Sequence, residues 1–114
     1  MRVHDLKDEK GRVFAFEVAN TVIGRGGACA IVNRIPGSKI LHAPTFGSWL
    51  REEQFCEFEV NGRRFVIWEP FGDNSRYWIG TEPPIWCEEL GEVRQAFLGA
   101  NPLFASVRSL FRIK

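Results

Sequence analysis

The dipeptide Asn61-Gly62 constrains the fold of this chain more tightly than any other feature of its sequence. It separates two runs of strand-forming residues, 55–60 and 63–68, and both of its residues tolerate the positive φ angles of a type I′ hairpin turn. Because a two-residue loop fixes the register, each residue before the turn is assigned a partner after it. The predicted pairs are Val60 with Arg63, Glu59 with Arg64, Phe58 with Phe65, Glu57 with Val66, Cys56 with Ile67, and Phe55 with Trp68.

Alternation along the hairpin sorts its side chains onto two faces. One face carries Cys56, Phe58, Phe65 and Ile67, and the other carries Phe55, Glu57, Glu59, Arg64, Val66 and Trp68. If helices cover the first face, the second exposes aromatic side chains among acids, and apolar surface rimmed by charge commonly marks a partner site. The alternative is that this second face is half of a two-sided core or is itself the face that the helices cover.

Alternation of apolar and polar residues predicts further strands around the hairpin. The expected strands are residues 2–6 and 13–18, which pair across a charged turn at 7–11, then 28–35 and 76–80. A turn at Pro36-Gly37 is followed by a short apolar piece at 39–43, and the conformation of 36–53 is left open. The run GRGG at 24–27 is interpreted as a bulge or tight bend, because the apolar stretch ACAIV that follows it reads as a strand. A phosphate-binding loop would lead into a helix instead.

The stretch WEPFGDNSRYW, residues 68–78, raises the question of a catalytic loop. Asp73 and Asn74 are residue types that bond back to their own backbone in turns, so 71–75 is expected to be the bend between two antiparallel strands. A single helical turn is expected at 48–52.

Helical periodicity begins after residue 84. Trp86, Leu90, Val93 and Phe97 recur at the spacing of one helix face, early glutamates suit the helix dipole, and Gly99 supplies a stop signal. The tail repeats this spacing with Leu103, Val107 and Leu110 beside Phe104 and Phe111, which predicts a second helix, although a strand over 106–113 fits as well. Residues 1–114 are therefore expected to form a single α+β domain, with an antiparallel sheet of about six strands and one or two C-terminal helices packed on one face.

Residues suited to catalysis or metal binding are sparse. Cys29, Cys56 and Cys87 have the spacing of neither a disulfide framework nor a zinc site, and His4 and His42 lie far apart in the sequence. We therefore expect no metal, no cofactor and no enzymatic activity. No secretory signal or membrane-spanning segment is found, so the expected location is cytoplasmic.

Charge is distributed unevenly along the chain. The net charge of +1 gives no basic field for nucleic acid, but residues 1–51 carry +4, residues 52–92 carry −7 and residues 93–114 carry +4. The acidic block, residues 52–92, contains the predicted hairpin and the loop after it. An acidic, aromatic surface that docks a basic protein is therefore predicted.

In the order and kind of its elements, the chain resembles the immunity proteins which bacteria make against their own polymorphic or contact-dependent toxins. The segment on which this resemblance rests is FCEFEVNGRRFVIWEPFGDNSRYW. The resemblance implies a non-enzymatic monomer or homodimer that binds a toxin domain, often a basic nuclease, in the cytoplasm. The expected contact residues are Glu57, Glu59, Trp68, Glu69, Asp73, Tyr77 and Trp78.

Two other functions remain alternatives. One is a small enzyme or small-molecule-binding domain, with a pocket between sheet and helices and Asp73, Arg76, His42 or Cys56 near its mouth. The other is a homo-oligomeric structural module whose aromatic face pairs with its own copy.

Overall fold

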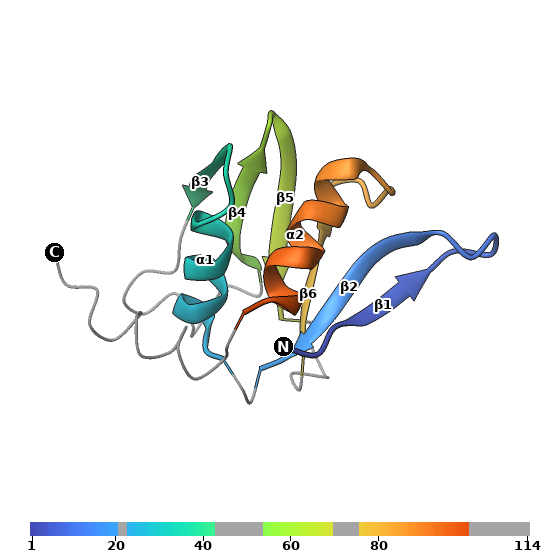
Figure 1. Ribbon diagram of the computed structural model, residues 1–114, viewed down its shortest axis with the longest axis horizontal. Helices are drawn as coiled ribbons and strands as arrows, with labels where there is room; N and C mark the ends of the chain where they lie inside the picture. Colours follow the sequence, from blue (N-terminus) through green and yellow to red (C-terminus); the bar gives the residue numbers. More distant parts are fainter. Residues whose placement is uncertain (21–22, 43–53, 70–75, 101–114) are drawn as a thin grey trace, which may run out of the picture.

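The computed structural model describes residues 1–20, 23–42, 54–69 and 76–100, and within them the chain has the predicted α+β architecture (Figure 1). The strands are β1 (His4–Lys7), β2 (Val13–Ala19), β3 (Ser38–His42), β4 (Gln54–Val60), β5 (Arg63–Trp68) and β6 (Arg76–Thr81). The helices are α1 (Arg25–Asn33) and α2 (Glu88–Leu98).

The strands form one antiparallel sheet in the order β1-β2-β6-β5-β4-β3. After the β1–β2 hairpin the chain crosses through α1 to the far edge of the sheet. It then returns strand by strand until β6 pairs with β2 (Figure 1). This path places β5 and β6 near the middle of the sheet, where both lie between two neighbours.

The predicted hairpin is confirmed over five of its six pairs, from Val60 opposite Arg63 to Cys56 opposite Ile67. The turn has the left-handed geometry that its sequence demands, with φ of 51° at Asn61 and 83° at Gly62. The sixth pair is wrong, because a bulge shifts the register between Gln54 and Cys56 and places Gln54 opposite Trp68.

The bulge changes the environment of Phe55, which was predicted to share a face with Glu57. Phe55 is fully buried, and its ring packs edge-on against Tyr77 with centroids 4.9 Å apart. The extra residue in the strand therefore sends Phe55 into the core.

Residues 28–35 were predicted to form a strand, and this was wrong. Arg25–Asn33 is a helix whose N-cap is Gly24, so the GRGG run begins a helix rather than forming a bulge. Its residues from Gly27 to Val32 are all buried, so the sequence shows an unbroken apolar run instead of a helical period.

Helix α2 was predicted correctly, and it packs on the same side of the sheet as α1 (Figure 1). Leu90, Val93 and Phe97 are fully buried in a core shared with α1 and with alternate residues of β2, β4, β5 and β6. Trp86 was predicted to share their face but precedes the N-cap, Cys87, and is 49% exposed. In the order of the chain, α2 therefore follows the last described strand, whereas α1 comes between β2 and β3.

Three predictions fall on residues outside the described ranges: the helical turn at 48–52, the bend at 71–75, and the helix or strand in the tail. Across the described residues, no helix is long and apolar enough to cross a membrane.

Candidate functional site

The side of the sheet away from α1 and α2 carries a distinct set of side chains, which we call the open face. It consists of Glu17 (β2), Lys39 (β3), Glu57 and Glu59 (β4), Arg64, Val66 and Trp68 (β5), and Arg76 and Trp78 (β6). Alternation requires this placement, because the intervening residues Phe16, Phe58, Phe65, Ile67 and Ile79 all belong to the helix-covered core. No helix of the described chain lies on the open face.

Two tryptophans lie together in the middle of the open face. Trp68 and Trp78 are direct partners across β5 and β6, and their rings meet edge to face with centroids 6.1 Å apart. A Cβ atom added at Gly80 would lie 2.7 Å from Cη2 of Trp78, so the missing side chain makes room for this ring. Both indoles remain partly exposed, whereas Val66 beside them is only 4% exposed.

Acids and bases alternate around the tryptophans. Glu17 forms an ion pair with Arg76 at 3.3 Å, and Glu57 pairs with Arg64 while accepting a hydrogen bond from Gln54. Glu59 lies in register between Lys39 and Arg64.

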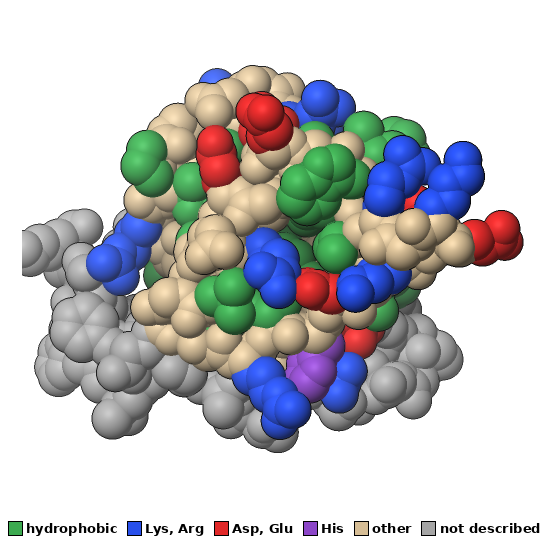
Figure 2. Space-filling model, turned by 45° about the vertical axis from the view of Figure 1, so that its right-hand side comes forward, with side chains coloured by type: hydrophobic (Ala, Val, Ile, Leu, Met, Phe, Trp, Pro, Cys, Tyr) green, Lys and Arg blue, Asp and Glu red, His purple; other side chains and the backbone are tan. Residues whose placement is uncertain are grey.

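The open face is therefore mixed in charge. The expected acidic concentration does not form on it, because bases from β3, β5 and β6 lie among its glutamates. Figure 2 looks instead onto the helix side and the β1–β2 edge of the molecule, where acidic, basic and hydrophobic side chains are also interspersed.

Glu69 and Tyr77, both predicted as contact residues, lie on the helix side of the sheet. Glu69 pairs with Arg25 of α1 at 2.8 Å and accepts a hydrogen bond from Nδ2 of Asn20 at 2.9 Å. Tyr77 is 4% exposed, and burial together with the nearby Glu69 carboxylate raises its pKa to about 12. These two side chains help to join α1 to the sheet.

The seven predicted contact residues thus separate into three groups. Glu57, Glu59, Trp68 and Trp78 come together on the open face, Glu69 and Tyr77 lie behind it, and Asp73 falls outside the described residues. The predicted contact residues included neither Glu17 nor Arg76, although both have the strand parity that places them beside Trp78.

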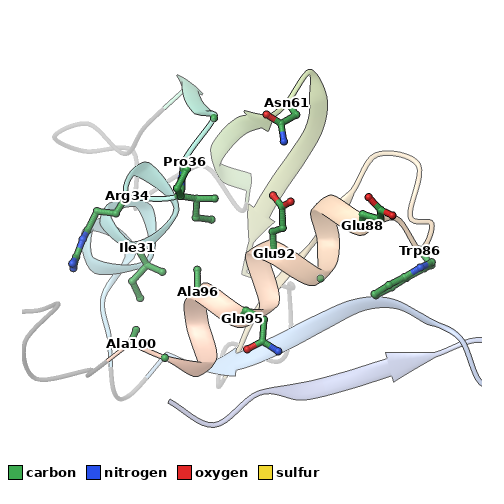
Figure 3. A pocket seen from close by; sticks show the side chains of 14 residues that line it. Ile31, Arg34, Pro36, Asn61, Trp86, Glu88, Glu92, Gln95, Ala96 and Ala100 are labelled. Atoms are coloured by element: carbon green, nitrogen blue, oxygen red, sulfur yellow. The ribbon is translucent and has the colours of Figure 1, made fainter.

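A second feature is a groove of about 1340 Å³ between α1 and α2 on the helix side (Figure 3). Its lining residues are Ile31, Arg34, Ile35, Pro36, Gly37, Asn61, Trp86, Glu88, Gly91, Glu92, Gln95, Ala96, Gly99 and Ala100. We call this feature the α1–α2 groove. Arg76, His42 and Cys56, which the enzyme hypothesis placed near a pocket mouth, do not line it.

Cys56 instead lies fully buried beside Cys29. The hydrogen bond with Cys29, together with burial, raises the pKa of the Cys56 thiol and keeps it neutral, which makes it a poor nucleophile. Within the described ranges, no three His, Cys, Asp or Glu side chains are grouped so that they could hold a metal ion.

Comparison with models of protein families, with curated proteins and with solved structures finds no match to this chain.

Proposed function

We propose that this protein is a non-enzymatic binding protein of the immunity type, which neutralises a bacterial toxin domain by docking the open face against it. The observation that carries the proposal is the Trp68–Trp78 pair, partly exposed in the middle of a sheet face that neither described helix covers. Tryptophan is enriched among the residues that dominate binding energy, most of all when it lies near the centre of an interface.

The surroundings of this pair suit an interface rim. Charged groups such as Glu17, Arg76 and Arg64 surround the indoles, and polar rims of this kind exclude water around an apolar centre. Because both signs are present, a partner needs a complementary pattern of charges, which favours specificity over general attraction.

Glu59 is the acid most available to a basic partner. It forms no ion pair with another described residue, whereas Glu17 and Glu57 each do. We therefore assign Glu59 to meet a Lys or Arg side chain of the toxin domain.

Variants of the open face test the proposal. Wild-type protein is used to capture its partner from the native cell, and the purified partner is then measured by surface plasmon resonance against Trp68→Ala, Glu59→Lys and Glu9→Lys. The last variant makes the same charge change in the exposed turn between β1 and β2, away from the tryptophans.

We expect Trp68→Ala to weaken binding about ten- to a hundredfold, mainly through faster dissociation. Glu59→Lys should slow association, and Glu9→Lys should leave both rates unchanged. If Trp68→Ala and Glu59→Lys bind like the wild type while their near-UV circular dichroism stays native, the open face is not the interface. Capture of a small metabolite instead of a protein would favour the ligand-binding alternative.

A further inference from the structure

Two of the three buried cysteines lie side by side between α1 and β4. Cys29 of α1 is 7% exposed, and Cys56 of β4 is fully buried. Their thiols share a hydrogen bond, and Cys56 keeps its proton because this hydrogen bond and burial both raise its pKa. The third cysteine, Cys87, belongs to a different element, since it is the N-cap of α2.

The packing of α1 against β4 brings the same two residues together independently of the thiols (Figure 1). The guanidinium of Arg25 lies 4.8 Å from the centre of the Phe55 ring, so the first turn of α1 meets β4 at Phe55. Residues four apart on a helix share a face, so Cys29 follows Arg25 on the face that meets this strand.

The bulge in β4 completes the arrangement. Consecutive strand residues normally point to opposite faces, but the bulge sends both Phe55 and Cys56 into the helix-covered core. Arg25 contacts the first of these two residues, and Cys29, one turn later on α1, contacts the second.

We propose that Cys29 and Cys56 are a redox modification site, at which a peroxide joins the two sulfur atoms in a disulfide that ties α1 covalently to β4. The two hydrogen-bonded sulfur atoms need only close to the bond length of about 2.05 Å. The site is separate from the proposed binding surface, because both thiols lie on the helix side of the sheet and the open face lies on the other.

The reaction with hydrogen peroxide takes place in two steps. Cys29, the less buried thiol, loses its proton, and its sulfur attacks one peroxide oxygen. An S–O bond forms, the O–O bond breaks, and the leaving hydroxide takes up a proton to become water, which leaves a sulfenic acid on Cys29. The Cys56 sulfur then attacks the Cys29 sulfur, so that the S–S bond forms and the S–O bond breaks. The hydroxyl group leaves as a second water with the Cys56 proton.

The proposal names a peroxide because the site is enclosed by the core. Hydrogen peroxide is small and uncharged, so it enters buried regions that a bulky, charged thiol reagent does not reach within minutes. The disulfide closes the loop between residues 29 and 56, and closing a loop stabilises the folded state mainly by restricting the unfolded chain. Oxidation should therefore strengthen the attachment of α1 to the sheet.

Peptide mapping of the oxidised full-length protein tests the site. The native protein is incubated with excess hydrogen peroxide for several hours, the peroxide is removed with catalase, and the remaining thiols are alkylated in denaturant. Digestion without reductant and mass spectrometry then identify any linked peptides. Cys29→Ser and Cys87→Ser are treated in the same way, and urea denaturation is measured before oxidation, after it and after added dithiothreitol.

We expect wild type and Cys87→Ser each to lose two alkylatable thiols to a single Cys29–Cys56 disulfide, and Cys29→Ser to form none. The urea midpoint of the wild type should rise on oxidation and return with dithiothreitol. A disulfide that involves Cys87, sulfinic acid without any disulfide, or three free thiols after treatment overturns the proposal. The wild-type peptide map gives this result even if Cys29→Ser does not fold.

Discussion

Arg25 in the first turn of α1 and Glu69 after β5 form an ion pair across 44 positions of sequence, with Nη2 2.8 Å from Oε1. Both side chains are largely shielded, at 16% and 19% exposure, and the guanidinium lies 4.8 Å from the centre of the Phe55 ring. This contact joins the basic first block of the sequence to the acidic second block. It also anchors the start of α1 to the sheet.

Removing one partner of this pair should destabilise the fold. Glu69→Ala removes the shielded ion pair with Arg25 and the hydrogen bond that Glu69 accepts from Asn20, and we expect a loss of about 2 kcal/mol in the free energy of unfolding. Urea denaturation measures the loss as a lower midpoint. Glu59→Ala on the open face is the matched control, with an expected change within about 0.5 kcal/mol. Equal effects of the two variants would contradict this role of the ion pair.

The single tyrosine gives a pH-dependent signal. Because Tyr77 has a pKa of about 12 in the folded chain and about 10 when unfolded, the unfolded state releases its proton first. The contribution of Tyr77 to stability is therefore complete below pH 10 and is lost as the pH rises from 10 towards 12. Absorbance at the phenolate band should show ionisation near pH 12 in the native protein and near pH 10 in denaturant. A native transition near pH 10 would show that Tyr77 is not shielded.

Gly80 is required by the tryptophan packing. A Cβ atom there would lie 2.7 Å from Trp78 and 3.0 Å from Cβ of Ala15. We expect Gly80→Val to cost about 1–3 kcal/mol through overpacking and to change the tryptophan fluorescence. Gly24→Ala is the control and should keep the native spectrum, because an added Cβ atom there meets nothing within 4 Å apart from its own chain neighbours. Unchanged fluorescence in Gly80→Val would contradict the described position of Trp78.

The three cysteines should be unreactive in the native state. Cys29, Cys56 and Cys87 are all buried, and the raised pKa of Cys56 further reduces its thiolate fraction. A thiol reagent such as DTNB should label none of them within minutes at neutral pH and all of them in denaturant. Rapid labelling of the native protein would show that the core opens around α1 more readily than its packing indicates.

The hairpin and its two faces were predictable because their signals are local. Asn61-Gly62 dictates the turn, and alternation places Phe58 and Phe65 on one side with Glu57 and Trp68 on the other. Those rules fail only at Phe55, where the bulge inserts a residue that no local pattern marks.

The sequence by itself determined the elements whose periodicity is visible: the β4–β5 hairpin, the strand pairing of β1 with β2, and the face of α2. Tertiary structure decided what α1 is, because a run buried on every side has no period to read. It also decided how the charges combine. Blocks that are basic or acidic along the chain become neighbours in the fold. Arg76 meets Glu17 in the sheet, and Arg25 of α1 meets Glu69 after β5, since electrostatic energy depends on distance in space and not on separation in sequence.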